Sequence, residues 1–346
     1  MSYSEAELIK RGLKSFVDTA IVKELNKKAL RKHLAQKREA TIQELSKLTA
    51  LSVVTVKTLL AQMIEKGEVS EGRFIPSGGG RPSQLFAYNG EHRHAVVIYG
   101  YQKDNRNSIH ILVVNLFGEC VYKKQTFLDD IQVDSFCGML DNVIQAYPDV
   151  TVIAFGLPGF EESGVIVAND YSGIVGNRFM PFYQARYELP VIFSNDVNAA
   201  VKGYAESFAD SPCLVGIYFP RIYSPGAGMV LGGDVYTGSQ HFAGEIGQLL
   251  PDTDWTQLDY SDGQTMRDTV SRLLSIYCRI LAPHQFVLYG DFFSVSDTEI
   301  IKQKTQSLLN GQFRVNVTLS SAFEADFERG MIVLALSLIN ERNLLD

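Results

Sequence analysis

The sequence predicts an α/β protein in which a small winged helix-turn-helix precedes a larger body of mixed strands and helices. Residues 41–65 are typical of two short helices joined by a turn, and a glycine-rich hairpin follows them. From residue 93 on, apolar strand-like segments alternate with helical ones. The charge divides at the same place, because residues 1–90 hold 15 Lys and Arg against 9 Asp and Glu, whereas the remainder holds 17 against 30. A basic head on an acidic body indicates that the head alone meets a polyanion.

The first of the two short helices is predicted to begin after Thr41. A threonine followed three residues later by a glutamate, here Glu44, is typical of a capping box, in which each side chain satisfies a backbone amide of the first turn. Ile42, Leu45 and Leu48 then fall on one helical face. This face is therefore expected to be buried.

The second helix is predicted to follow a break at residues 49–51, with Ser52 as its N-cap. Apolar residues recur at helical spacing and are expected to pack on the first helix: Val53, Val56, Leu60 and Met63. The opposite face bears short or flexible polar groups that suit contacts with base edges and phosphates. Two helices joined by so short a turn are typical of a helix-turn-helix. The DNA-contacting residues expected from this segment are Thr41, Ser52, Thr55, Lys57, Thr58 and Gln62.

A β-hairpin wing is predicted after Gly67, where two strand-like pieces flank a glycine-rich tip in the stretch EGRFIPSGGGRPSQLFAY. Arg73 and Arg81 are expected to touch the DNA backbone or the minor groove. The alternative interpretation of the two helices is a plain helical hairpin, and that of the glycine-rich stretch is a flexible linker. The order of helix, turn, helix and basic hairpin favours DNA binding. The helical region from Glu5 to about Gln36 is expected to complete the bundle and to assist dimerisation.

The body is predicted to begin with an antiparallel meander that leads into a helix and a further strand. Its first elements are the strands His94–Tyr101, Ser108–Asn115 and Cys120–Phe127, the helix Val133–Ala146 and the strand Val150–Phe155. This order is typical of a mixed α/β domain.

Three segments of the body resemble the ROK family of repressors, open reading frames and sugar kinases. They are Phe155–Gly159 (FGLPG), Leu189–Ala200 (LPVIFSNDVNAA) and Gly238–Gly247 (GSQHFAGEIG), which occur in the order and approximate spacing of that family. The tripeptide Gly80-Arg81-Pro82 also resembles the hairpin of ROK repressors. The resemblance runs over nearly the whole chain.

The resemblance implies a two-lobed, actin-like (ribonuclease H-like) ATPase fold, with a ligand held in the cleft between the lobes. It divides the chain into a winged helix-turn-helix domain at 1–90 and a sugar-kinase-like effector domain at 91–346. The lobes are expected at about 91–205, together with the C-terminal helix, and at 206–329.

Sugar-binding residues are expected where strands end and glycine-bracketed loops begin. Asn195 and Asp196 follow a strand and open a helix, and Glu245 lies in a loop that can approach a ligand closely. An alternative role for Asp196 is that of a helix N-cap, and for Gly156 and Gly159 that of an ordinary turn. With the family's pattern, the expected sugar-binding residues are Gly159, Asn195, Asp196, Glu245 and Gln248.

The elements that hold ATP phosphates in ROK kinases are degraded in this sequence. The first phosphate loop is replaced by Tyr99-Gly100-Tyr101-Gln102-Lys103-Asp104, which lacks the leading acid and the double glycine. The second is replaced by the stretch from Pro220 to Gly228, and the adenosine-side glycines by Leu288-Tyr289-Gly290-Asp291. We therefore expect no catalytic residues, no cofactor and no enzymatic activity.

No metal site is expected either. Gln248 stands where the family has a zinc-binding histidine, and the family's cysteine cluster is missing from the residues that follow. The four cysteines of the chain, Cys120, Cys137, Cys213 and Cys278, are scattered as in a reduced cytoplasmic protein.

The function expected from these features is that of a sequence-specific DNA-binding transcriptional regulator, a repressor of carbohydrate metabolism that is gated by a sugar. Its expected partners are double-stranded operator DNA, a small-molecule sugar and a second copy of the chain, as a homodimer or a dimer of dimers. No membrane partner is expected, because no apolar run approaches the length of a membrane span and the N-terminus is polar. The alternatives are a ROK-type sugar kinase with an atypical nucleotide site and a regulator that responds to a protein partner.

Overall fold

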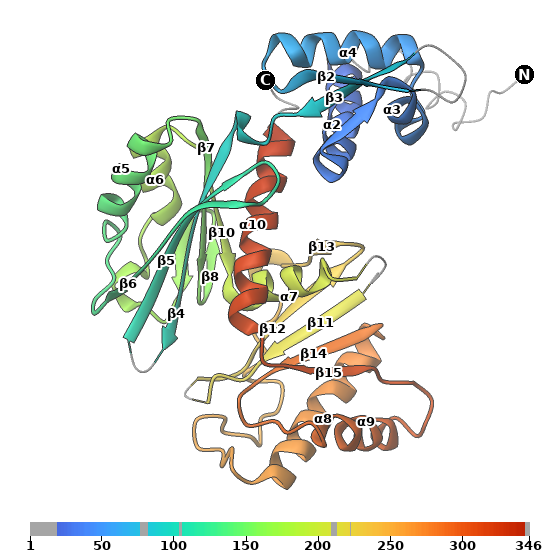
Figure 1. The fold of residues 1–346 in the computed structure, drawn as a ribbon. Coiled ribbons are helices and arrows are strands. Elements are labelled where there is room, and N and C mark those ends of the chain that lie inside the picture. Colours follow the sequence, from blue (N-terminus) through green and yellow to red (C-terminus); the bar gives the residue numbers. More distant parts are fainter. Residues whose placement is uncertain (1–18, 77–81, 104–105, 209–212, 222, 343–346) are drawn as a thin grey trace, which may run out of the picture.

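The computed structural model describes residues 19–76, 82–103, 106–208, 213–221 and 223–342. Figure 1 shows a small N-terminal head packed at one end of a longer body that consists of two stacked lobes. The head contains α2 (Thr19–Lys37), β1 (Glu39–Thr41), α3 (Ile42–Thr49), α4 (Val53–Glu65), β2 (Val69–Ile75) and β3 (Ser83–Tyr88). Its antiparallel sheet has the order β1-β3-β2, so β2 and β3 form the predicted hairpin.

The predicted helix-turn-helix is present between α3 and α4. Thr41 and Glu44 form both halves of the capping box, and Ser52 caps α4 by accepting a hydrogen bond from the Thr55 amide. Ala50 ends α3 in the left-handed conformation at φ 56°. The two helices are bent by 112°, within the range of about 90–120° that is usual for this motif.

The core of the head is formed by one face of each helix and by the sheet. Its fully buried residues include Leu30 and Leu34 of α2, Leu45 of α3 and Met63 of α4. The expectation that Val53 packs into this core is wrong, because Val53 is 48% exposed and Leu59 takes the buried position instead. In the first turn of α4, Val53 and Val54 face solvent, whereas Val56 is buried.

The first lobe is built on a five-stranded sheet with helices on both faces (Figure 1). Its strands are β4 (His94–Lys103), β5 (Arg106–Asn115), β6 (Cys120–Leu128), β7 (Val150–Leu157) and β10 (Val191–Asn195), in the order β10-β7-β4-β5-β6. Strands β4, β7 and β10 run parallel, and β5 is antiparallel to its neighbours. Helices α5 (Cys137–Ala146) and α6 (Phe179–Tyr187) cover one face, where they share a core with β4, β5 and β7.

The second lobe repeats this strand order. Its strands are β11 (Cys213–Tyr218), β12 (Gly226–Leu231), β13 (Asp234–Val235), β14 (Gln285–Tyr289) and β15 (Val317–Ser320), in the order β13-β12-β11-β14-β15. The middle strand β11 pairs antiparallel with β12 and parallel with β14, as β4 does with β5 and β7. Two lobes of the same topology around a cleft match the predicted fold class.

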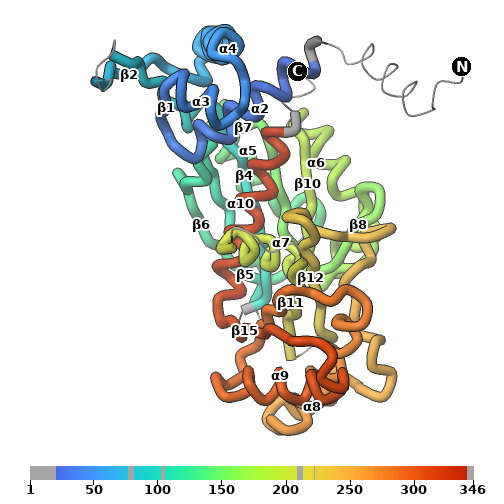
Figure 2. Tube along the Cα trace, turned by 90° about the vertical axis from the view of Figure 1, so that its right-hand side faces the viewer, coloured from blue at the N-terminus to red at the C-terminus, as the bar shows by residue number. Residues whose placement is uncertain are grey.

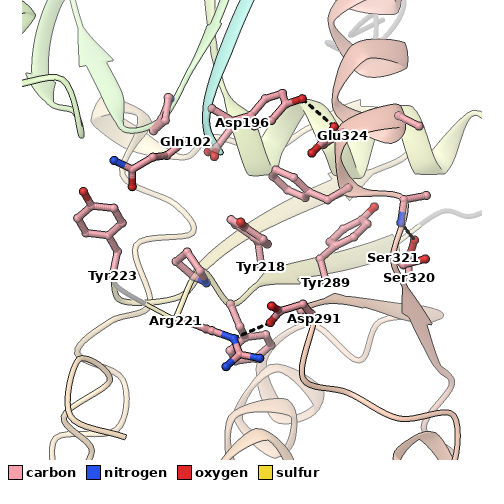
Figure 3. A pocket seen from close by; sticks show the side chains of 18 of the residues that line it. Gln102, Asp196, Tyr218, Arg221, Tyr223, Tyr289, Asp291, Ser320, Ser321 and Glu324 are labelled. Atoms are coloured by element: carbon pink, nitrogen blue, oxygen red, sulfur yellow. Dashed lines mark hydrogen bonds and ion pairs between the residues drawn. The ribbon is translucent and has the colours of Figure 1, made fainter. Parts of the chain in front are cut away.

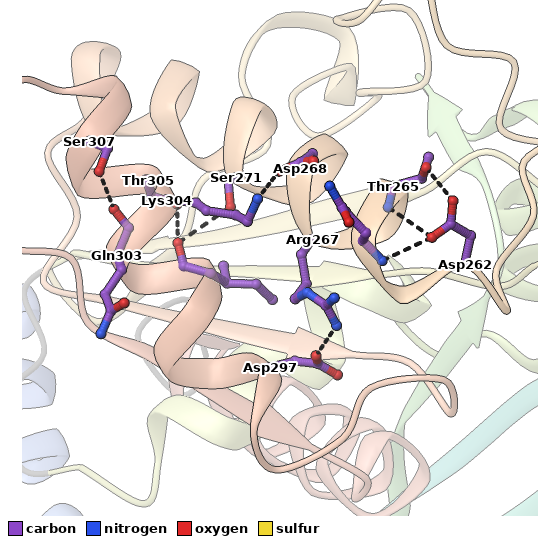
Figure 4. Close-up of polar contacts among 12 residues, drawn as sticks. Asp262, Thr265, Arg267, Asp268, Ser271, Asp297, Gln303, Lys304, Thr305 and Ser307 are labelled. Atoms are coloured by element: carbon purple, nitrogen blue, oxygen red, sulfur yellow. Dashed lines mark hydrogen bonds and ion pairs between the residues drawn. The ribbon is translucent and has the colours of Figure 1, made fainter.

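Helices α8 (Gly263–Ile280) and α9 (Asp297–Leu308) cover the outer face of the second sheet, and polar contacts join them (Figure 4). Asp262 caps α8 by accepting from the amides of Gln264 and Thr265. Arg267 of α8 donates to Asp297 at the start of α9 at 2.8 Å. These contacts hold α8 and α9 together on the outer face of the second lobe.

Two helices cross between the lobes, α7 (Asp196–Ala205) and the long C-terminal α10 (Phe323–Arg342), as Figures 1 and 2 show. They approach closely because of glycines: a Cβ on Gly330 would lie 1.7 Å from the carbonyl oxygen of Ala199, and one on Gly203 would lie 1.9 Å from that of Asp326. Helix α10 also packs on β4 and β7 of the first lobe. We propose the domain division at residue 90 and the lobe division near residue 205 on this basis.

Some helices and strands begin or end at other residues than the sequence predicts. The helix predicted at 133–146 begins only at Cys137, because residues 133–136 form turns. Strand β7 extends to Leu157, beyond the predicted Phe155. No single helix in the described ranges is both long and apolar enough to cross a membrane, and α3 with α4 reaches that length and composition only as a sharply bent pair.

Candidate functional site

The cleft between the lobes contains two adjoining pockets. The near pocket, of about 690 Å³, is lined by Gly159, Asn195, Glu245 and Gln248 among others. The far pocket, of about 640 Å³, is lined by segments that include Tyr101, Arg221, Tyr289 and Asp291. Six residues line both pockets: Pro158, Asp170, Asp196, Tyr218, Pro220 and Tyr223. The carboxyl ends of β7, β10, β11 and β14 all lead into this cleft, which is where α/β sheets place ligands.

All five residues expected to bind sugar line the near pocket. Asn195 is the N-cap of α7, and its side-chain oxygen accepts hydrogen bonds from the amides of Val197 and Asn198. Its amide nitrogen donates to the carbonyl oxygen of Gly159 at 2.9 Å. The capping role considered for Asp196 therefore belongs to Asn195, which leaves the Asp196 carboxylate beside the cavity.

Asp196 is the buried carboxylate shared by both pockets. Its side chain is withdrawn from water and accepts a hydrogen bond from the Val197 amide at 2.9 Å. Burial, with a further contribution from the nearby charge of Asp170, raises the pKa of Asp196 to about 7. Such a group changes its protonation state near neutral pH, and its ionised form can accept hydrogen bonds from ligand hydroxyls.

Gly159 shapes the floor of the near pocket through its backbone. It adopts φ +89°, and a Cβ there would lie 2.0 Å from the carbonyl oxygen of Ala168. No other residue type fits this turn without moving β9 (Val165–Ala168). The turn brings the Gly159 carbonyl oxygen to Asn195, so the ordinary-turn role of Gly159 and its place in the pocket coexist.

Glu245 reaches the cleft on a loop that is pinned to β12. Gly244 has φ +106°, and its carbonyl oxygen accepts a hydrogen bond from the Ala227 amide at 2.9 Å. Desolvation in the cleft and the charge of Asp170 raise the pKa of Glu245. Gln248 follows on the same loop and is exposed at the pocket wall.

The loop that replaces the family's cysteine cluster is held by a tryptophan. Trp255 is buried, packs against Phe219 and donates from its indole nitrogen to the carbonyl oxygen of Gly247 at 3.1 Å. An ion pair between Arg272 and Asp252 ties the same loop to α8. Across the described ranges, no group of three or more His, Cys, Asp or Glu is arranged to hold a metal ion. A direct hydrogen bond thus supports the segment next to Gln248.

The three degraded nucleotide segments converge on the far pocket (Figure 3). Tyr101, at the place of the first phosphate loop, donates its hydroxyl to Glu324 at 2.7 Å. Arg221 pairs with Asp291 at 2.7 Å, which joins the second segment to the third. In the described part of this pocket, the three segments thus present side chains that are bonded to one another or to α10. Asp104 and Ile222 lie outside the described residues.

Aromatic rings form much of the far pocket's surface. Tyr218 stacks on Phe323 with ring centroids 4.1 Å apart, and Tyr289 packs edge-on to the same Phe323. Tyr223 is 41% exposed at the boundary between the pockets. The far pocket therefore presents the faces of aromatic rings to a ligand.

The sequence reasoning missed Asp170 and the tyrosines. Asp170 lines both pockets, and desolvation raises its pKa. A signal was available, because Asn169 and Asp170 are a polar pair that directly follows the apolar strand β9. Tyr218 could be found in the same way, as the last residue of β11.

The DNA-contact candidates of the head differ in exposure. Ser52, Lys57, Thr58 and Arg73 are exposed, and Arg73 forms a long ion pair with Glu39 at 3.4 Å. Thr55 and Gln62 are half-buried, and Arg81 lies outside the described residues.

Two corrections to the expected DNA-contact face follow from burial. Thr41 is 5% exposed and its hydroxyl is used within the capping box, so its side chain is not presented to a partner. Val54 was not expected on this face, yet it is 75% exposed in the first turn of α4.

The ROK family model matches residues 106–264, which include the near pocket and most of the cleft. These residues are a ROK domain. The chain is 28% identical over 246 residues to a protein of Caldicellulosiruptor sp. (strain Rt8B.4) whose name assigns it, provisionally, to the xylose repressors. It is 24% identical over 245 residues to the xylose repressor of Bacillus subtilis (strain 168). These matches cover 67% and 68% of the chain, and 60% and 62% of the two relatives.

Kinases of the family match as well, over less of the chain. The N-acetyl-D-glucosamine kinase of Aliivibrio salmonicida (strain LFI1238) is 30% identical over 111 residues, which are 31% of this chain and 36% of the kinase. Among solved structures, a ROK family transcriptional regulator, described as a homologue of the E. coli MLC protein, superposes with a TM-score of 0.62 at 16% identity over 91% of the chain and 99% of its own. The ROK hexokinase from Thermus thermophilus gives 0.57 at 16% identity over 72% and 99%. The predicted fold, a winged helix-turn-helix followed by the two-lobed actin-like fold, is confirmed.

Proposed function

We propose that this ROK protein is a sequence-specific DNA-binding transcriptional regulator, a repressor of carbohydrate metabolism whose DNA binding changes when a sugar enters the near pocket. The observation that carries the proposal is the pairing of a winged helix-turn-helix with a cleft that keeps a buried carboxylate and lacks a phosphate cradle. The names of the repressor relatives support the same conclusion.

The exposed face of the first two turns of α4 is the surface that we assign to base contacts. It presents Lys57 and Thr58 beside the apolar side chain of Val54. Lysine suits guanine edges and phosphates, threonine suits either base edge or phosphate, and an apolar group suits the thymine methyl. The hairpin β2–β3 with Arg73 stands beside α4 as a wing for the backbone. Two half-sites would need two heads, which is why we propose a homodimer or a dimer of dimers.

Helix α10 connects the cleft to the head. Its first residue, Phe323, stacks on Tyr218 in the far pocket. Near its other end, Ile332 and Leu336 lie 3.5 Å from the position that a Cβ on Gly118 would occupy, in the turn between β5 and β6. The neighbouring Phe117 receives the Arg38 guanidinium of the head over its ring at 3.8 Å. A shift of α10 on ligand binding would therefore move the contact on which the head rests.

Selection of duplexes from a random DNA library by the full chain tests the DNA-binding half of the proposal. The expected result is one enriched, two-fold symmetric sequence whose affinity falls steeply with salt. Lys57→Ala should weaken binding to that sequence by about tenfold. Lys124→Ala, which removes the same charge from β6, is the matched control and should not change binding. The absence of any enriched sequence would contradict the proposal.

The alternative function is that of a sugar kinase. It is favoured by Asp196, since a buried carboxylate with a pKa of about 7 is suited to act as a general base on a sugar hydroxyl. The far pocket opposes it, because Tyr101, Arg221 and Asp291 stand where phosphates would be held. A coupled assay with ATP and a sugar panel separates the two, since turnover at ordinary kinase rates would exclude the non-enzymatic proposal.

A further inference from the structure

The near and far pockets form one continuous groove. The six residues common to both linings lie at the ends of β7, β9, β10 and β11 or just after them, so the two volumes meet along the same residues. Each pocket alone falls in the range of about 300–1,000 Å³ that holds a drug-sized ligand. The groove therefore has room for a ligand that extends past Asp196 into the far pocket.

The far pocket offers rings and hydroxyl partners together. Tyr218 and Tyr223 line both pockets, and Figure 3 shows Gln102 close to Tyr223. Ser320 and Ser321 line the other end. A sugar ring has an apolar face of C–H groups and a rim of hydroxyls, and this combination of aromatic and small polar side chains fits both.

The charge of the groove excludes phosphorylated ligands. Asp170, Asp196, Asp291 and Glu324 line the far pocket, and Arg221, the one cation among the described lining residues, is already paired with Asp291. The N-terminus of α10 points toward this pocket, but its first turn contains Glu324 and Asp326, which match the helix dipole. A phosphate placed here would meet like charges without a free cationic partner.

We propose that the groove binds an unphosphorylated saccharide of at least two units, with one unit among Asn195, Asp196 and Glu245 and the next over the tyrosines of the far pocket. This inference rests on the proposed sugar binding in the near pocket. The place that holds ATP in the family's kinases becomes the subsite for the second sugar unit.

Isothermal titration of the full chain tests the inference with matched ligands. The panel is cellobiose, maltose and xylobiose, the monosaccharides glucose and xylose, glucose 6-phosphate, and ATP. We expect one disaccharide to bind at least about tenfold more tightly than the monosaccharide of which it is made, because the second unit buries additional surface on the tyrosines. Glucose 6-phosphate and ATP should bind more weakly than that disaccharide.

A blocking variant localises the second unit. Ser321→Trp places a large ring in the far pocket from an exposed position, and it should remove the tenfold advantage of the disaccharide while leaving monosaccharide affinity unchanged. Ser307→Trp adds the same ring on the outer surface of α9, where Ser307 is exposed, and should leave both affinities unchanged.

The outcomes separate this inference from the function on which it rests. Equal affinities for monosaccharide and disaccharide, or tighter binding of glucose 6-phosphate or ATP, would overturn the inference and leave near-pocket sugar binding in place. Equal loss of both affinities in Ser321→Trp would also overturn it. Binding of none of the saccharides would remove the sugar part of the proposed function as well, and the DNA selection would still report on the head independently.

Discussion

The near and far pockets share six wall residues, yet their polar groups are used differently. In the far pocket, polar side chains are bonded to one another, as Arg221 is to Asp291 and Tyr101 is to Glu324. In the near pocket, Asn195 positions the backbone, while the Asp196 carboxylate accepts an amide hydrogen bond from Val197 at 2.9 Å and keeps acceptor sites for a ligand. The contrast teaches that one pocket keeps hydrogen-bonding capacity for a ligand, whereas the other offers mainly shape and rings.

The largest effect is expected from removing the near-pocket carboxylate. Asp196→Ala should weaken binding of the preferred saccharide by about 100-fold, because hydrogen bonds from hydroxyls to a charged acceptor contribute about 1.5–3 kcal/mol each. Asp291→Ala is the matched far-pocket change and should weaken binding less than about threefold, since Asp291 is already paired with Arg221. Isothermal titration measures both. Equal losses in the two variants would break the distinction between the pockets.

A pH dependence of ligand binding should follow from the same carboxylate. Because the pKa of Asp196 is about 7 in the ligand-free protein, the ionised fraction that accepts hydroxyl hydrogen bonds increases about tenfold between pH 6 and pH 8. The saccharide affinity of the wild type should increase by a similar factor across that range. Asp196→Asn should bind weakly and without this slope. A flat wild-type profile would contradict the assignment of Asp196 to ligand binding.

Whereas saccharide affinity should increase with pH, the stability of the ligand-free protein should decrease with pH. A carboxyl group whose folded pKa is raised holds more protons in the folded than in the unfolded state, so stability is lost as the pH rises from about 4 to about 7. Asp196→Asn removes this loss and should raise the midpoint of thermal unfolding at pH 8 by about 5 °C. At pH 4 the gain should vanish. Calorimetry of wild type and Asp196→Asn at pH 4 and pH 8 measures these midpoints. A lower midpoint for the variant than for the wild type at pH 8 would show that the carboxylate stabilises the fold.

The smallest effect is expected at the loop that supports the near pocket. Trp255→Phe keeps the packing on Phe219 and loses the hydrogen bond to the Gly247 carbonyl oxygen. We expect about 1 kcal/mol less stability and a two- to threefold weaker saccharide affinity. Denaturant unfolding and titration measure the two changes. An unchanged affinity would show that the loop beside Gln248 is positioned by other contacts.

The elements that could be predicted from the sequence are those with local signals. The caps at Thr41 and Ser52, the hairpin and the polar pair at the end of β10 follow from patterns within a few residues. The exposure of Val53 and the burial of Thr41 could not be predicted, because they depend on how the helices and the sheet of the head pack on one another. Asp170 and Tyr218 have a local signal, because they lie at the ends of β9 and β11, but that both line the same two pockets follows only from the meeting of the lobes.

One measurement tests the central claim most directly: the Kd of the full chain for its selected duplex, with and without the saccharide that binds the groove. The account predicts a change of about 5–150-fold in wild type, corresponding to a coupling of about 1–3 kcal/mol. The same experiment with Asp196→Ala should show no change at that saccharide concentration. An identical Kd for the wild type in both conditions would contradict ligand-gated DNA binding.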